Sequence, residues 1–500
     1  MVNAPNVFAL TSQFELFPTE LASPTEDSVL YMAFSSPLAT VGEGNGILDY
    51  YEARRSSGGW ETVRRLGPNG LESSRTIPGG ATPDHSYAFM EVESLVGTLA
   101  GNGPISYVVN PDNTFELTGV GSLGTEPAAE GRYITEDGDH IIFTTGKSPS
   151  QSHNCAFSKE CLVRRLEEDA PGGGAGVVYD RSANGPTHVI SLLPPNVTPP
   201  DGEQAYYQGT SKDASSVAFT INGTLYVRVR NGEVGAETEE VAAAEPVFSG
   251  ISREGRYLFY VTGGGTGTIH RFDTTDESDE ELNASAPGEV VNISADGSHV
   301  YFISNKQIEG QGKEGFPNLY VWSEGGVAYV ATVSLSDLER TSGDQNSFCA
   351  ETKVCGAPAL TRWTTDAVAP SQAPIERGPG ADSSRATPDG KVLVFESKAK
   401  LTGYENANPA ACPSWTAPGP DGVEGTADDI VLNEEGRCTE IYRYEEGKGL
   451  TCLSCNLGKP AGGDAHLQDL DLAPAPIVVN NLSTDGGRVF FETPESLVES

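Results

Sequence analysis

The stretch that decides the fold runs from Thr387 to Ser397 and reads TPDGKVLVFES. It joins a turn signal, Asp389-Gly390, to an uninterrupted apolar run from Val392 to Phe395. An Asp-Gly pair between apolar segments predicts a β-hairpin, and a type I′ turn needs positive φ angles at both central residues. An uninterrupted apolar run predicts a strand buried on both faces, because a half-exposed strand would alternate apolar and polar residues.

Versions of this segment recur along the whole chain. Each contains a small polar residue, an acidic residue, a turn residue and then a run of apolar residues. The acidic residues are Asp27, Asp84, Asp137, Asp213, Glu254, Asp296, Asp389 and Asp485. The copies at Asp27, Asp84 and Asp213 lack the turn glycine. A third and a fourth strand are expected after the hairpin, as at 319–322 and 327–330.

The spacing of the copies predicts the fold. Asp213 and Glu254 are 41 residues apart, and Glu254 and Asp296 are 42 residues apart, which matches the roughly 40–45 residues of a four-stranded propeller blade. Repeated hairpins that are buried on both faces imply sheets stacked face to face. We therefore expect an all-β protein: a β-propeller of four-stranded antiparallel blades, eight by the hairpin count, with seven as the alternative.

The hairpin and the strand that follows it also resemble a known family. The Ser/Thr-Pro-Asp-Gly-Lys pattern, followed by an Ile/Leu-Tyr strand, resembles the WD-repeat-like propeller repeat of TolB-type periplasmic proteins. Asp389, Gly390 and Phe395 match that pattern most closely, and the copies span residues 23–493. The resemblance implies the propeller fold but no particular activity, because propellers serve unrelated functions.

The repeats predict one propeller domain over residues 23–500, preceded by an N-terminal segment, 1–22. The last hairpin, which ends near Thr493, has no third or fourth strand after it. Either residues 6–17 complete that blade or the chain is a fragment of a longer one. Residues 1–20 lack the basic start and apolar core of a signal peptide. No run of 18 apolar residues occurs, so no membrane-spanning helix is expected.

The charge of the chain excludes several kinds of partner. Its 70 acidic residues outnumber 32 basic ones, which gives a formal charge of −38. Nucleic-acid binding requires a basic surface, and anionic lipid would also be repelled. The acidic surface is interpreted as a solubility device, with cation binding or a high-salt environment as the alternative.

The eight cysteines fall into local pairs. The pairs are Cys155 with Cys161, Cys349 with Cys355, Cys412 with Cys438, and Cys452 with Cys455. An even count in short loops predicts disulfides, and hence an extracellular, periplasmic or cell-surface location. The alternative is a four-cysteine zinc site built from the last two pairs, only one of which has tight ligand spacing. A redox Cys-x-x-Cys is disfavoured, because Cys452 follows a strand and does not open a helix.

Long loops are expected at one end of the blades. The spacing between the acidic turn residue and the tyrosine of the third strand differs between repeats. It is 13 residues for Asp213 and Tyr226, but 53 residues for Asp389 and Tyr442. The extra length therefore lies between strands two and three. The long segment 331–386 connects one blade to the next. In an up-and-down blade, the loops between strands two and three and the connections between blades lie at the same end of the blade. Because loops on a rigid scaffold usually carry binding, this long-loop surface is the predicted binding surface.

One loop on that surface is a candidate metal site. Residues 421–429 offer the carboxylates of Asp421, Glu424, Asp428 and Asp429 in a glycine-containing loop. Hard cations take several oxygen ligands, and calcium is the candidate cofactor. The spacing does not match an EF-hand, and the alternative is a solvated acidic loop.

The remaining polar residues of interest are interpreted as structural. Asp137, Asp296, Asp389 and Asp485 can accept hydrogen bonds from backbone N–H groups of their own turns. His466, in the loop 462–466, is the one histidine that we consider as a site residue. No catalytic residue is assigned, because neither a Gly-x-Ser-x-Gly elbow nor a His-Glu-x-x-His motif occurs.

Three functions are compatible with these features. The first is a non-enzymatic propeller that binds a protein or glycan ligand outside the cell through the long-loop surface. The second is a propeller hydrolase or lyase with a site in the central channel, either with or without a bound divalent cation. A channel-facing cluster of at least three Asp, Glu or His side chains would favour this enzyme, and a channel lined by small and apolar residues would exclude it. The third is a regulatory propeller whose partner domain lies outside these 500 residues.

Overall fold

The computed structural model describes residues 21–23, 27–34, 46–66, 74–92, 105–126, 129–145, 165–172, 176–182, 186–195, 197, 203–244, 246–263, 267–283, 286–338, 384–417, 430–467 and 481–497. The chain divides into two compact units. Unit 1 comprises Met1–Val241, Pro370–Gly378 and Leu472–Ile477, and unit 2 comprises Ala242–Ala369, Pro379–Asp471 and Val478–Ser500. Each unit is described by itself.

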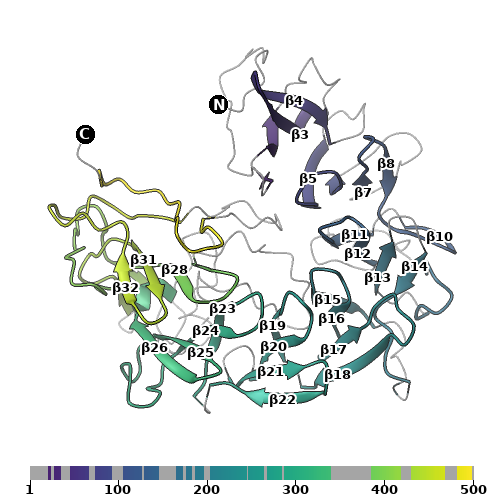
Figure 1. The fold of residues 1–500 in the computed structure, drawn as a ribbon. Coiled ribbons are helices and arrows are strands. Elements are labelled where there is room, and N and C mark those ends of the chain that lie inside the picture. Colours follow the sequence, from purple (N-terminus) through teal and green to yellow (C-terminus); the bar gives the residue numbers. More distant parts are fainter. Residues whose placement is uncertain are drawn as a thin grey trace. The chain divides into compact units, whose positions relative to one another are not determined.

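Unit 1 is built from antiparallel four-stranded meanders (Figure 1). Their strands are β1 (Leu21–Ala22), β2 (Ser28–Phe34), β3 (Gly46–Ser56) and β4 (Gly59–Arg65); β5 (Ser74–Ala81), β6 (Ala88–Val92), β7 (Ile105–Val109) and β8 (Phe115–Leu117); β11 (Glu130–Ile134), β12 (His140–Thr145), β13 (Val177–Ser182) and β14 (Thr187–Val189); and β15 (Ala205–Thr210), β16 (Ser216–Ile221), β17 (Thr224–Val229) and β18 (Glu237–Ala242). A small hairpin pairs β9 (Val120–Gly121) with β10 (Gly124–Thr125).

Unit 2 repeats the same pattern. Its strands are β19 (Val247–Ile251), β20 (Tyr257–Val261), β21 (Ile269–Asp273) and β22 (Ser278–Glu281); β23 (Glu289–Ile293), β24 (His299–Ser304), β25 (Asn318–Ser323) and β26 (Gly326–Thr332); and β27 (Ser384–Ala386), β28 (Val392–Ser397), β31 (Glu440–Glu445) and β32 (Gly449–Cys452). The hairpin β29 (Trp415–Ala417) and β30 (Ile430–Leu432) lies in the insertion between β28 and β31. The eighth predicted hairpin is present as the bridge Leu482↔Val489.

These meanders confirm the predicted fold class, an all-β propeller type built from four-stranded antiparallel blades. The second strand of a blade is one of its two inner strands. Three of these second strands, β16, β24 and β28, are buried at every position. The burial on both faces was predicted from the uninterrupted apolar runs. Among the described residues the only helical turn is a 3-10 turn, Leu335–Leu338, and they include no helix with the length and hydropathy of a membrane span.

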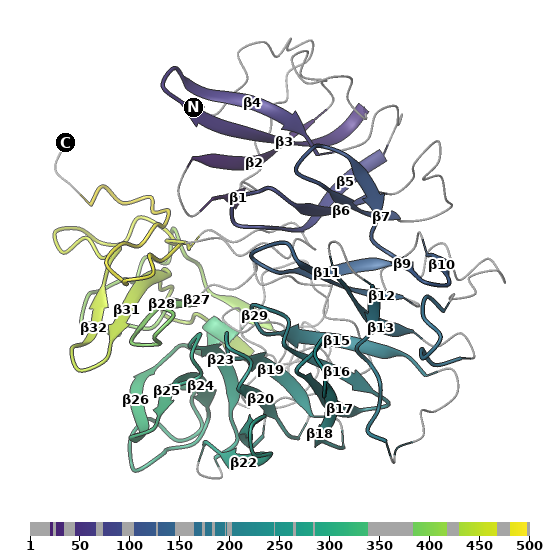
Figure 2. The same cartoon turned by 45° about the vertical axis from the view of Figure 1, so that its right-hand side comes forward.

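The first two meanders are joined, which the repeat did not predict. β3 has eleven residues, and β4 pairs only with its part from Tyr51 to Ser56. The start of β3 is therefore free on that side, and Gly46 and Leu48 pair there in parallel with Ser74 and Arg75 of β5. Figure 2 shows β1 to β4 side by side, with β5 next to the start of β3.

The hairpin turns correct the type I′ prediction. In the turn before β28, the N–H of Thr387 donates to Val392 O at 2.9 Å and the N–H of Gly390 donates to Thr387 O at 2.8 Å. Gly390 has a φ of +69°, but Asp389 has no positive φ. The loop is longer than a two-residue turn, so a single left-handed residue is enough. In copies without the glycine, His85 and Ala214 take that conformation, each with a φ of 58°.

A repeated aromatic pair fills the centre of most blades. A second-strand aromatic residue stands directly opposite a third-strand ring in the register. The pairs are Phe143–Tyr179, Phe219–Tyr226, Phe302–Tyr320 and Phe395–Tyr442, with ring centroids 5.3–5.9 Å apart. Such cross-strand pairs stabilise a sheet beyond their buried area.

Candidate functional site

The candidate site lies in unit 2, where residues 398–439 form a long insertion between β28 and β31. The sequence predicted its length, since this is the longest gap between a second and a third strand. Tyr442 of β31 holds its start, because its hydroxyl donates to Ala399 O at 2.8 Å. The shorter loop between β24 and β25 is held in the same way, by Tyr320 donating to Gln311 O at 2.8 Å. The third-strand tyrosine thus anchors the loop that precedes it.

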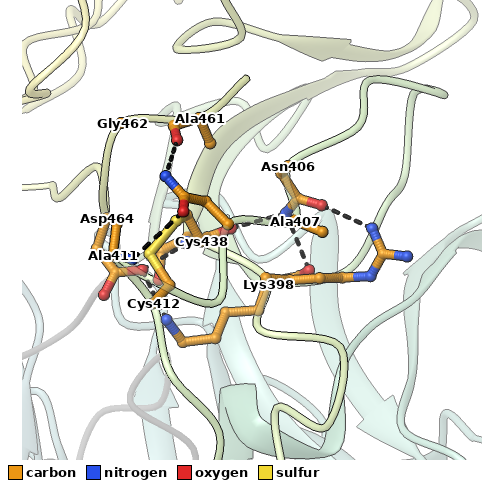
Figure 3. The surroundings of a disulfide bond; sticks show 12 residues. Lys398, Asn406, Ala407, Ala411, Cys412, Cys438, Ala461, Gly462 and Asp464 are labelled. Carbon is orange, nitrogen blue, oxygen red and sulfur yellow. Dashed lines mark hydrogen bonds and ion pairs between the residues drawn. A yellow bond between two sulfur atoms is a disulfide. The ribbon is translucent and has the colours of Figure 1, made fainter.

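A buried disulfide closes the insertion. Cys412 and Cys438 are bonded, with Cα atoms 5.2 Å apart, and they are 3% and 0% exposed. Asn406 lies beside them and donates to Lys398 O at 3.0 Å and to Cys438 O at 2.7 Å. Arg437 donates to Asn406 Oδ1 at 2.9 Å. Figure 3 shows these contacts around the two sulfur atoms. The base of the insertion is therefore rigid.

An ion pair joins the insertion to the segment after β32. Lys398 Nζ contacts Asp464 Oδ1 at 2.6 Å, and the Thr439 N–H donates to the same oxygen at 2.6 Å. Burial opposes ionisation of Asp464, but the hydrogen bond and charge of Lys398 outweigh it and hold the pKa of Asp464 below its usual value. His466, the histidine singled out from the sequence, has an exposed side chain, and its backbone pairs with Glu492.

A second carboxyl group lies at the start of β31. Glu440 is 2% exposed, and burial raises its pKa to about 7, against a hydrogen bond donated by Ser454 Oγ. The negative charges of Glu495 and Asp464 raise it further. An oxygen of Glu440 and the sulfur atoms of Cys452 and Cys455 lie within 4.8 Å of one another. Glu440 can therefore hold or release a proton near neutral pH.

A third buried carboxyl group supports the start of the insertion. Asp337 accepts the Ser397 hydroxyl, the Lys398 N–H at 2.7 Å and the Ser334 N–H at 2.8 Å. Burial raises its pKa to about 6, although these hydrogen bonds and the charge of Lys398 favour the ionised form. No local pattern in the sequence identified Asp337, Glu440 or Asp464, because the chain brings them together from separate segments.

The structure overturns the zinc alternative. Cys412 is bonded to Cys438, and Cys452 is bonded to Cys455. These four sulfurs are therefore not thiolates and cannot ligate a zinc ion together. The two bonds are the local pairs expected from the sequence. The other predicted pairs, Cys155 with Cys161 and Cys349 with Cys355, lie outside the described residues, as do Asp421, Glu424, Asp428 and Asp429 of the candidate calcium loop.

The turn aspartates make hydrogen bonds within their own hairpins. Asp389 Oδ1 accepts the Thr387 hydroxyl at 2.7 Å and the Lys391 N–H at 3.2 Å. The hydrogen bond from Thr387 is the main cause that lowers the pKa of Asp389. Asp137, Asp296 and Asp485 accept the equivalent hydroxyl and N–H groups. These contacts account for the repeated acid without a catalytic role.

Comparison with known proteins finds distant structural likenesses. No family model and no curated protein matches it. A prolyl endopeptidase is 11% identical over 88% of this chain and 49% of its own, with a TM-score of 0.40, so the chain spans about half of that enzyme's length. Putative TolB of Agrobacterium tumefaciens is 15% identical over 54% of this chain and 83% of its own, with a TM-score of 0.27. An oligogalacturonate lyase of Vibrio parahaemolyticus is 12% identical over 76% and 86%, with a TM-score of 0.35.

Proposed function

We propose that the protein is a non-enzymatic propeller scaffold that binds a protein or glycan ligand through its long-loop surface outside the cell. The observation that carries the proposal is the insertion 398–439. A buried disulfide and Asn406 close its base, Tyr442 ties it to β31, and Asp464 ties it to the segment after β32. A loop whose base is held in place loses less entropy when it binds, and this improves affinity. The rigid base is the property expected of a binding loop.

The same disulfides support the proposed compartment. Cys412–Cys438 and Cys452–Cys455 suit an oxidising environment, because cytosolic proteins keep their thiols reduced. The formal charge of −38 directs the choice of ligand towards neutral or basic partners, since a polyanion would be repelled. The resemblance of the repeat to TolB-type periplasmic proteins agrees with this location.

The experiment is a binding screen with two sets of variants. The chain is tested on a glycan array and against purified extracellular proteins, and hits are measured by surface plasmon resonance. The double variant Ser414→Arg, Glu434→Arg changes exposed residues of the insertion. Glu324→Arg, on the β25–β26 turn at the other end of its blade, is the control for the introduction of a positive charge. We expect the double variant to weaken binding by about tenfold or more, as loss of a central contact does, and the control to bind normally. Equal binding by both would reject the long-loop surface.

A hydrolase or lyase is the second candidate. It is favoured by one observation, the buried carboxyl group of Glu440, whose pKa burial raises to about 7, since such a pKa suits general acid catalysis. The test is release of new chain ends from neutral and acidic polysaccharides, with and without Ca²⁺. An enzyme would lose activity in Glu440→Gln and Asp464→Asn. If the native chain cleaves none of these polymers, the enzyme hypothesis is rejected and the binding scaffold is retained.

A further inference from the structure

The disulfide Cys452–Cys455 differs from Cys412–Cys438 in its surroundings. It closes a loop of Cys-Leu-Ser-Cys at the end of β32, and both of its cysteines are half-buried. Cys412 and Cys438 are fully buried. Of these two disulfides, only Cys452–Cys455 has the partial exposure that gives an attacking thiol access to a sulfur atom.

Glu440 is built into the same loop. Ser454, which lies between the two cysteines, donates its hydroxyl to Glu440 Oε2 and accepts the Ile441 N–H at 2.8 Å. The Leu453 N–H donates to Ile441 O at 2.8 Å. The loop is thereby fixed on β31, with the carboxylate of Glu440 within 4.8 Å of both sulfurs. One water molecule can bridge such a separation for proton transfer.

We propose that Cys452–Cys455 is a thiol–disulfide exchange site, with Glu440 as its proton relay and a dithiol, on a protein or a small molecule, as its reaction partner. The sequence disfavoured this chemistry, because a redox pair usually lies at a helix N-terminus, where the helix dipole stabilises a thiolate. Here the buried carboxyl group of Glu440, positioned by its hydrogen bond from Ser454, protonates the leaving sulfur.

The reaction balances in two steps. One thiol of the partner loses its proton to water and attacks a sulfur of the pair. The Cys452–Cys455 bond breaks, a mixed disulfide forms, and the leaving thiolate takes a proton from the Glu440 carboxyl group. The second thiol of the partner gives its proton to the Glu440 carboxylate and attacks the mixed disulfide. The leaving cysteine takes a proton from water. The cysteine pair gains two electrons and two protons, and the partner loses them.

The charged groups around Glu440 keep its proton available. Asp464 and Glu495 face it, and their negative charges disfavour its ionised form. Lys398 contacts Asp464 and leaves that group ionised. Glu495 is held by the Gly462 N–H. The rate of thiol–disulfide exchange should therefore depend on the protonation of Glu440, which titrates near pH 7.

The native full-length chain provides the first test. It is incubated with dithiothreitol over a pH range that brackets 7, thiols are trapped with N-ethylmaleimide, and each cysteine is identified by peptide mass mapping. We expect Cys452–Cys455 to be reduced at least about tenfold faster than Cys412–Cys438, because access controls the attack. The slope of the plot of the Cys452–Cys455 reduction rate against pH should also change near pH 7. Equal rates for the two disulfides would overturn the proposal, and this comparison needs no variant.

Variants test the relay. Glu440→Gln should slow reduction by about tenfold near neutral pH and remove the change near pH 7. Glu440→Asp should keep part of the rate, and Glu324→Gln, an exposed glutamate on another turn, should leave it unchanged. An unaltered rate and pH profile in Glu440→Gln would exclude Glu440 as the relay. Thermal unfolding of each variant shows whether it folds. If Glu440→Gln does not fold, the pH profile of the native chain decides whether Glu440 is the relay.

Discussion

Gly390, in the turn before β28, lies against His299, the first residue of β24 in the preceding blade. A Cβ atom at Gly390 would lie 2.5 Å from His299 Cβ. The same relationship recurs between Gly297 and Tyr257 and between Gly486 and Val392. Each turn glycine therefore has two reasons to be a glycine: its positive φ and its close approach to the neighbouring blade.

The first prediction concerns this contact. Gly390→Ala should destabilise unit 2 by about 2–4 kcal/mol, because it adds overpacking to the cost of a left-handed alanine. Gly447→Ala is the control, since Gly447 has a φ of +74° but no atom near its Cβ position, and it should lose only about 1 kcal/mol. Urea unfolding measures both. Equal losses would show that the contact between blades contributes nothing.

The second prediction concerns the tyrosine that anchors the insertion. Tyr442→Phe keeps the ring pair with Phe395 but removes the hydrogen bond to Ala399 O, so unfolding should require about 1 kcal/mol less. Hydrogen exchange should accelerate at the start of the insertion and not in β28. Tyr444→Phe, which changes a ring packed against Tyr301, is the control and should leave exchange in the insertion unaltered.

The third prediction concerns pH. Burial raises the pKa of Asp337 to about 6 and that of Glu440 to about 7, above the values of 3.8 and 4.5 that apply without it. The folded state therefore holds these protons more tightly than the unfolded state, so their effect on stability is most favourable at low pH. Stability should fall as pH rises through this window and level off above 7.

Glu440→Gln isolates one of these groups. Above pH 7 the variant should be more stable than the native chain by on the order of 2 kcal/mol, because it has no charge to bury. Below the titration range the two should converge. Chemical unfolding at several pH values measures the difference. A constant difference across the range would mean that Glu440 does not titrate with a raised pKa.

The fourth prediction concerns the disulfide of the insertion. Cys412 and Cys438 are 26 residues apart, so replacing both with alanine should cost about 3.5 kcal/mol, as expected for a loop of this length. The double replacement of Cys452 and Cys455, which are 3 residues apart, should cost roughly half as much. Only the first should weaken ligand binding, because only that disulfide closes the insertion. Thermal unfolding and plasmon resonance measure the two effects.

Much of the fold could be predicted from local patterns. Asp389-Gly390 and the run from Val392 to Phe395 identified a hairpin and a strand buried on both faces, and β28 is such a strand. The hairpin geometry was wrong, since a longer loop needs one left-handed residue where a type I′ turn needs two. The parallel pairing of β3 with β5 was missed, because it depends on the relative lengths of β3 and β4.

Taken alone, the sequence determined the repeat, the pairing of strands within each blade and the two cysteine pairs that the structure describes. These are short-range features, and neighbouring residues specify them through turn chemistry and apolar periodicity. Only the tertiary structure decided which polar groups meet. Glu440 on β31, Ser454 beyond β32 and Glu495 near the end of the chain converge because packed strands bring distant segments together. Burial there, and not residue type, is what raises the pKa of Glu440 to about 7.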